Sequence, residues 1–145
     1  MVSMDREYLV LMMEAGYIYM GMQRYNEARD VFEGLTVLAP DSDVPWVALG
    51  GVFFCEGNFK GAEKCYAKAL KNDPDSLYAK AYLAEAFFFM KKKEESVTLF
   101  QEVSRADTGA VGDFARAFLD AAKKGLDVEE LSSVKAVREF HEKRD

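Results

Sequence analysis

The stretch that decides the fold is VPWVALGGVFFCEGNFKGAEKCYAKALKNDP, residues 44–74. At an offset of 34 residues, a glycine, an alanine and a proline of this stretch fall on the same residue types in the preceding segment. The offset places Gly50 on Gly16 and Ala62 on Ala28. Proline, phenylalanine and tyrosine also recur at this offset, as Pro40 and Pro74, as Tyr19, Phe53 and Phe87, and as Phe32, Tyr66 and Phe100. The sequence therefore predicts three repeats, over about residues 9–42, 43–76 and 77–110.

Each repeat is expected to be a pair of helices that cross closely. Gly50 and Ala62 are small, which suits a point where the two helices of the middle repeat touch. Phe53 and Tyr66 are expected to fill the space between neighbouring helices. A large residue at Gly50 should therefore damage the fold.

The ends of the predicted helices carry residues with a known preference for such positions. Proline has no amide donor and clashes with the preceding turn, so Pro74 is expected to end the second helix of the middle repeat. Asp75 or Ser76 is expected to cap the first helix of the third repeat. Asp43 is expected to cap the first helix of the middle repeat.

The period and the order of residues resemble the tetratricopeptide-repeat (TPR) family, whose unit is a helix-turn-helix. The residues that carry the resemblance in the middle repeat are Trp46, Leu49, Gly50, Phe53, Gly57, Phe59, Ala62, Tyr66, Ala69 and Pro74. The first repeat has Met12 in place of the tryptophan. The third departs from the pattern at Lys80, Ser96 and Thr108, which predicts a second helix that packs or ends less regularly. The resemblance implies an all-α TPR solenoid of three repeats.

Two more helices are expected after the repeats, over about residues 112–124 and 127–142. Phe114 and Phe118 lie on the apolar side of the first, and Gly125 is expected to end it. Asp127 with Glu130 resembles a capping box at the start of the second. Such a pair is expected to cap the open end of a repeat stack. The whole chain, residues 1–145, is then predicted to be a single domain.

Composition disfavours several classes of function. The formal net charge is −6, which repels the phosphate backbone of nucleic acids. No apolar run approaches the length of a membrane span, and the N-terminus lacks the pattern of a signal peptide, so a cytoplasmic location is expected. Cys55 and Cys65 have no zinc-ligand spacing, so neither a metal nor another cofactor is predicted.

Catalytic chemistry has no support in the sequence. The single histidine, His141, lies in the charged last turn of the chain, a poor place for a nucleophile-base pair. Neither GxxxxGK[ST] nor GxGxxG, the two glycine-rich phosphate-binding motifs, is present. We therefore predict a protein that is not an enzyme.

In TPR proteins the first helix of each repeat lines a concave groove, and the resemblance assigns inward positions here. We call the predicted client-binding residues the first-helix face; they are Val10, Met13, Tyr17, Met20, Val47, Gly51, Phe54, Tyr78, Ala81 and Phe88. The same positions extend to Cys55, Glu85 and Phe89. TPR proteins that grip acidic C-terminal tails place lysine and asparagine where Met13, Tyr17, Val47 and Gly51 stand, so that clamp is absent. An apolar face suits an apolar or amphipathic segment. The competing interpretation is that this stripe is core.

The compact acidic chain also resembles the TPR chaperones of bacterial type III secretion, most clearly in EAGYIYMGMQRYNEARDVF, residues 14–32. That resemblance implies a chaperone that holds an aggregation-prone helix of a secreted subunit before export. The early start of the first repeat favours chaperones of needle subunits over those of translocators. A second small co-chaperone is an additional candidate partner. The alternative is a general TPR adaptor in a larger complex.

Overall fold

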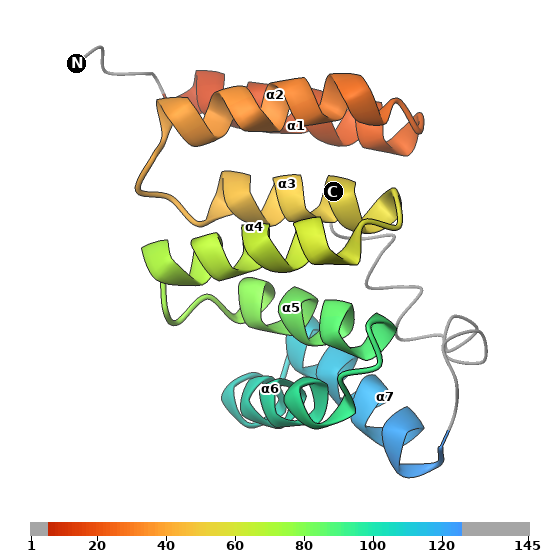
Figure 1. Cartoon of the computed structure of the whole chain (residues 1–145). Helices are drawn as coiled ribbons and strands as arrows, with labels where there is room; N and C mark the ends of the chain where they lie inside the picture. Colours follow the sequence, from red (N-terminus) through yellow and green to blue (C-terminus); the bar gives the residue numbers. More distant parts are fainter. Residues whose placement is uncertain (1–5, 126–145) are drawn as a thin grey trace. The chain divides into compact units, whose positions relative to one another are not determined.

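The computed structural model describes residues 6–125, which form helices connected by short turns (Figure 1). The helices are α1 (Arg6–Gly21), α2 (Tyr25–Leu38), α3 (Val44–Cys55), α4 (Phe59–Asn72), α5 (Leu77–Phe89), α6 (Lys93–Ala106) and α7 (Ala110–Lys123). These described residues contain no strand, which confirms the all-α prediction. The predicted helix over about 112–124 is confirmed by α7. The predicted helix over 127–142 and His141 lie outside the described residues.

The helices divide into two compact units, with α1–α4 before Pro74 and α5–α7 after it. In the first unit α1 packs on α2, α2 on α3 and α3 on α4. Its core is formed by residues of all four helices and includes Met20, Ala28, Phe32, Leu35, Ala48, Leu49, Val52 and Cys65. The single domain over residues 1–145 stays a prediction.

The second unit has an aromatic core. Its α6 packs on both α5 and α7, and α5 also contacts α7. The rings of Phe100 and Phe118 stack with their centroids 4.6 Å apart, and Phe114 meets Phe118 edge-on at 5.0 Å. All three rings are buried, so α7 is held to the α5–α6 pair through aromatic side chains.

The predicted close crossings are present in the first unit. A Cβ atom added to Gly50 would lie 2.4 Å from Cε1 of Tyr66, and one added to Gly16 would lie 2.4 Å from Cε1 of Phe32. Ala62 has no exposed surface. The helices of each pair are therefore close enough that only glycine fits opposite the aromatic ring, as the pattern indicates.

The third helix pair solves the same crossing differently. At the positions of Gly50 and Ala62 it has Ala84 and Ser96, and Ser96 is fully buried. The Ser96 hydroxyl donates a hydrogen bond of 2.7 Å to the carbonyl oxygen of Ala84. Lys80 pairs with Glu102 at 2.9 Å, and α6 runs for 14 residues, as α4 does. The prediction of a less regular second helix is therefore wrong, because two of the three departures, Lys80 and Ser96, form bonds within the pair and α6 is as long as α4.

Two of the predicted helix ends are confirmed and one is wrong. The Ser76 hydroxyl accepts a hydrogen bond from the Ala79 amide, and α4 ends at Asn72, just before Pro74. Asp43, however, makes no side-chain cap. Its φ and ψ are −77° and −27°, which is helical geometry, whereas a capping side chain needs an extended backbone. Ser42 instead accepts a hydrogen bond from the Val44 amide at 3.2 Å.

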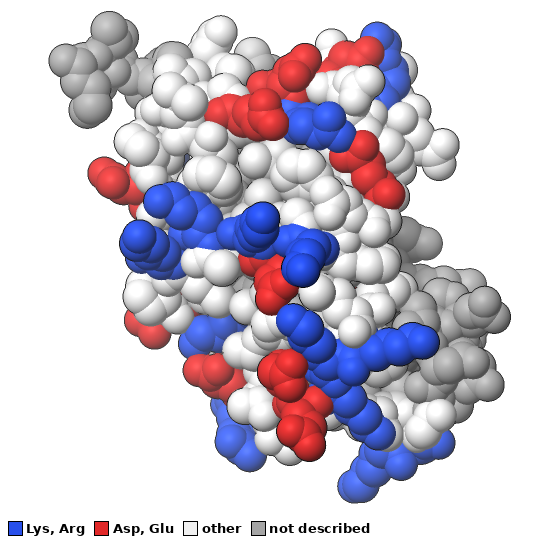
Figure 2. Space-filling model, in the orientation of Figure 1, with Lys and Arg blue, Asp and Glu red and all other residues white. Residues whose placement is uncertain are grey.

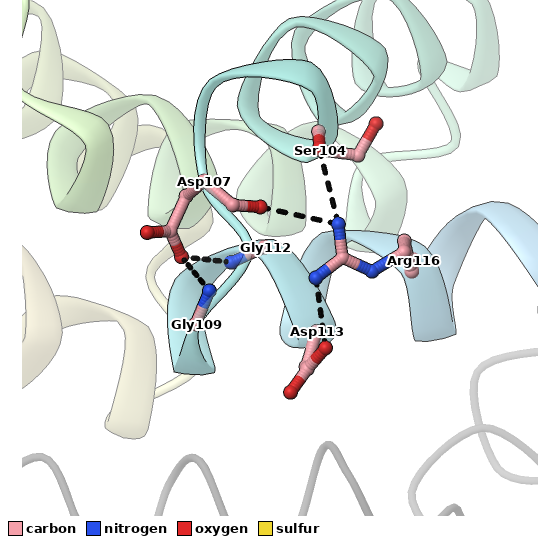
Figure 3. Close-up of polar contacts among 6 residues, drawn as sticks. All are labelled: Ser104, Asp107, Gly109, Gly112, Asp113 and Arg116. Carbon is pink, nitrogen blue, oxygen red and sulfur yellow. Dashed lines mark hydrogen bonds and ion pairs between the residues drawn. The ribbon is translucent and has the colours of Figure 1, made fainter.

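The turn between α6 and α7 is held by polar contacts (Figure 3). The Asp107 carboxylate accepts hydrogen bonds from the amides of Gly109 and Gly112, at 3.0 and 2.8 Å. Arg116 donates to the carbonyl oxygens of Ser104 and Asp107, at 3.0 and 3.1 Å. These bonds satisfy amides at the start of α7 and carbonyls at the end of α6 that no helical bond would use. At the other end of α7, Gly125 has a φ of +71°, which ends the helix as predicted.

Candidate protein-binding face

The four predicted residues of α1 range from exposed to buried. Val10 is 50% exposed, while Met13 and Tyr17 are partly buried against the core of the first unit. The Tyr17 ring meets the Phe32 ring edge-on, with centroids 5.3 Å apart. Met20 is part of the core itself. Of the four predicted residues, Val10, Met13 and Tyr17 therefore retain apolar surface.

The predicted residues of α3 also range from partly exposed to buried. Val47 and Phe54 are partly exposed, and Gly51 is buried. The Phe54 ring meets Phe59 edge-on at 5.2 Å, which orients the phenylalanine at the end of the helix. Cys55 is exposed, contrary to the interpretation of it as core between repeats.

In the second unit the α5 residues separate into surface and core. Tyr78 is 51% exposed, with its ring 6.4 Å from that of Tyr82. Ala81 has no exposed surface. Phe88 is partly exposed and meets Phe118 edge-on at 5.3 Å. Of the two neighbouring positions, Glu85 is buried and Phe89 is partly exposed.

The structure thus brings together only part of the predicted set. In the first unit, Met13 and Tyr17 of α1 pack against the same core cluster as Ala48, Leu49 and Val52 of α3. Three predicted residues, Met20, Gly51 and Ala81, are core and present almost no surface to a ligand. For these three the competing interpretation, that the stripe is core, is correct. The residues that retain surface are Val10, Met13, Tyr17, Val47 and Phe54 in the first unit and Tyr78 and Phe88 in the second.

The chemistry of these seven residues is apolar and aromatic. None of them carries a charge, so a ligand would be bound by apolar contact and by the edges and faces of rings. Methionine and aromatic side chains adapt to ligands of different shape. In each unit these residues can bind a polypeptide by burying apolar side chains. The only groups among them that could serve as an acid, a base or a nucleophile are the Tyr17 and Tyr78 hydroxyls.

The sequence analysis missed a second apolar row on α1. Tyr8, Leu11 and Ile18 of α1, and Met22 directly after it, are all more than half exposed. Their spacing along the chain is three, seven and four residues, which places them on one side of the helix. The helical periodicity alone could have found this row, but the repeat pattern directed attention to the inward positions.

Residues 6–125 contain one buried and one exposed thiol. Burial raises the pKa of the Cys65 thiol to about 12, with a smaller contribution from the charge of Glu33, so this thiol stays protonated. The described residues contain no cluster of histidine, cysteine and carboxylate side chains that could hold a metal ion. None of their helices is long and apolar enough to cross a membrane.

Two segments of the chain match family models, and both models describe the tetratricopeptide repeat. The matches cover residues 10–42 and 45–76, which are the first two predicted repeats. No curated protein matches the chain in sequence.

Several solved structures share the fold. The first TPR of Spaghetti (RPAP3), bound to the HSP90 peptide SRMEEVD, is 19% identical, with a TM-score of 0.75 over 86% of this chain and 98% of that one. The Yersinia enterocolitica type III secretion translocator chaperone SycD is 16% identical, with a TM-score of 0.75 over 81% and 91%. PcrH, a Pseudomonas aeruginosa protein, in complex with the chaperone-binding region of PopD is 16% identical, with a TM-score of 0.72 over 84% and 96%. At these identities the likeness establishes the fold alone.

Proposed function

We propose that this chain, which carries tetratricopeptide repeats and resembles the TPR chaperones of type III secretion, binds an apolar or amphipathic segment of a secreted subunit and shields it before export. The observation that carries the proposal is the partly exposed apolar part of the first-helix face. In the first unit it comprises Val10, Met13, Tyr17, Val47 and Phe54. Tyr78 and Phe88 provide a corresponding surface on α5 in the second unit.

The physical basis is burial of apolar surface. A client helix laid on these residues would remove its own apolar side from water, which is worth roughly 25 cal/mol for each Å² buried. An aggregation-prone helix has such a side, and covering it stoichiometrically would keep the subunit soluble. No turnover is needed, and the action takes place in the cytoplasm, where the subunit is made.

The chemistry of the face separates two kinds of TPR ligand. An acidic peptide such as SRMEEVD, the ligand of Spaghetti, offers carboxylates. The exposed residues of the first-helix face include no cation to bind those carboxylates, whereas their apolar side chains suit an apolar segment. PcrH, which shares the fold, is solved in complex with the chaperone-binding region of PopD, so a protein of this fold binds a segment of another protein.

The second candidate is a general TPR adaptor in a larger complex. It is favoured by the same apolar residues, because repeat proteins of this kind bind many helical or extended segments. The two candidates differ in the partner, which is a secreted subunit in one case and a resident protein of the complex in the other.

Co-expression of the chain with the proteins encoded beside it, followed by purification and mass spectrometry of the complex, tests the proposal. The expected result is a one-to-one complex with a needle or translocator subunit that precipitates when expressed alone. If the co-purifying partner is a soluble protein that is not exported, the adaptor function is correct and the chaperone function is wrong.

A further inference from the structure

One side of α4 carries a straight row of four exposed lysines. We call Lys60, Lys64, Lys68 and Lys71 the lysine row. Spacings of four, four and three residues place them on one face of the helix. With a rise of about 1.5 Å per residue, the row is about 16 Å long. Figure 2 shows it as a blue band over α4.

The charges of the lysine row are not neutralised inside the described part of the chain. None of the ion pairs found among residues 6–125 includes a lysine of the row. Lys68 lies over the ring of Trp46, with its Nζ 6.0 Å from the ring centroid. Like charges three or four residues apart repel one another on a helix, so the row opposes the stability of α4.

The repeat architecture does not require lysine at these positions. The equivalent residues of α2 are Asn26, Asp30, Gly34 and Val37, and those of α6 are Glu94, Thr98, Glu102 and Arg105. The other two helices of this type therefore carry neutral, acidic or mixed side chains where α4 carries four positive charges. A row that costs stability and is not demanded by the fold is expected to serve an interaction.

The surroundings of the row restrict the partner. The exposed carboxylates of Asp30 and Glu33 lie on neighbouring α2 in the same unit, and the charge of Glu33 acts on Cys65 of α4. Figure 2 shows red side chains over α2, above the blue band and separated from it by uncharged surface. A broad polyanion, such as a nucleic acid or an anionic membrane, would meet these carboxylates as well as the lysines. A narrow acidic helix would contact the lysine row alone.

We propose that the lysine row of α4 binds an acidic helix of a partner protein, with carboxylates spaced four residues apart along it. Lys60, Lys64 and Lys68 recur every four residues, so each of these three can face a carboxylate on a helix that lies alongside and repeats at the same interval, and Lys71 lies close to a fourth. This surface lies on α4 and not on the first-helix face, so the inference does not depend on the proposed function.

The test uses a fluorescein-labelled helical peptide with a glutamate at every fourth position, and a matched peptide with glutamine in those places. Fluorescence anisotropy measures binding to the full-length chain. The wild type is expected to bind the glutamate peptide at about 0.1 M salt and to lose it at about 1 M, where screening shortens the range of the charges. The glutamine peptide is expected not to bind.

Lys64→Glu is the informative variant because it acts in opposite directions on binding and stability. It turns two like-charge pairs, with Lys60 and Lys68, into opposite-charge pairs, so the melting temperature should rise. Binding of the glutamate peptide should weaken about fivefold or more, because one attraction becomes a repulsion. Lys93→Glu makes the same charge change at an exposed position of α6 and is expected to bind like the wild type.

The proposal is overturned if the wild type does not bind the glutamate peptide, or if Lys64→Glu binds it as well as the wild type does. Equal binding of the glutamine peptide would also overturn it. Tighter binding of oligothymidylate or of phosphatidylserine vesicles would assign the row to a nucleic acid or a membrane instead. Loss of client binding by first-helix-face variants leaves these results unchanged, so the two proposals fail separately.

Discussion

Gly50 of α3 faces the ring of Tyr66 on α4 so closely that a methyl group does not fit between them. The position of a Cβ on Gly50 lies 2.4 Å from Cε1 of Tyr66, and Tyr66 itself is buried. Gly16 and Phe32 have the same relationship one repeat earlier. The glycine of each repeat is therefore a packing requirement of the helix pair.

Replacing Gly50 with leucine should destabilise the first unit. The side chain would have to displace a buried aromatic ring, and such overpacking costs about 1–3 kcal/mol in the free energy of unfolding. Gly34→Ala is the matched control, because a Cβ at Gly34 of α2 meets no atom within 4 Å. That substitution should stabilise the helix by about 0.5–1 kcal/mol. Urea unfolding measures both, and equal midpoints for Gly50→Leu and wild type would contradict the close crossing.

Asp107→Ala should loosen α7. The substitution removes the acceptor of the Gly109 and Gly112 amides, and loss of such a cap costs about 1 kcal/mol. Asp120→Ala on the same helix removes only an exposed pair with Lys124 and should cost no more than about 0.5 kcal/mol. Hydrogen exchange at the start of α7 should rise in the first variant and stay constant in the second. Unchanged exchange in Asp107→Ala would show that the cap is not needed.

Arg29 and Glu56 should contribute jointly to the association of the first two repeats. Arg29 of α2 donates to Oε2 of Glu56 at 2.6 Å, and its guanidinium lies 5.5 Å from the centroid of the Phe53 ring. The hydrogen bond with Glu56 raises the pKa of Arg29. A double-mutant cycle with Arg29→Met and Glu56→Gln should give a coupling of about 1 kcal/mol. The exposed Arg24–Glu27 pair is the control and should give less than half of that. Zero coupling for the first pair would contradict its role.

The two thiols should differ in reactivity. Iodoacetamide at pH 8 is expected to modify the exposed Cys55 and leave Cys65 intact, because burial holds the pKa of Cys65 at about 12. Mass spectrometry should show one adduct on the folded protein and two after denaturation. The raised pKa also means that unfolded Cys65 ionises first, so the free energy of unfolding should fall as the pH rises from 9.0 toward 12. Two adducts on the folded protein would contradict the burial of Cys65.

The sequence predicted the fold through residues whose role is local. Few other residue types can replace Gly50, which faces the Tyr66 ring, or Pro74, which cannot continue a helix, so their recurrence indicates the helix pairs directly. The prediction from Ser96 of a less regular helix is wrong because Ser96 binds the carbonyl of Ala84 on the neighbouring helix, twelve residues away. The repeat pattern does not show such a bond. Asp43 has the right side chain for a cap but the wrong backbone geometry, which a sequence does not show.

The candidate site was harder to predict. Helical spacing identifies which residues share a face, but the width of the covered strip depends on the neighbouring helix. Val10 and Met20 share a face of α1, and yet one is half exposed and the other belongs to the core. The lysine row was not recognised because single lysines on a helix surface are ordinary, and only the comparison of the three repeats sets the row apart.

The central claim is that the first-helix face binds the client. It is tested most directly by calorimetric titration of a soluble peptide, the segment of the co-purified subunit that binds the chain, against three valine-to-glutamate variants. Val10→Glu and Val47→Glu place a charge on the face, whereas Val37→Glu makes the same change on α2, where the valine is 76% exposed. A charge forced against an apolar helix is costly, so the first two variants should bind about tenfold or more weakly. Val37→Glu should bind like the wild type. Val10→Glu should melt within a few degrees of the wild type, because Val10 is already half exposed. Wild-type affinity for both Val10→Glu and Val47→Glu would contradict the account.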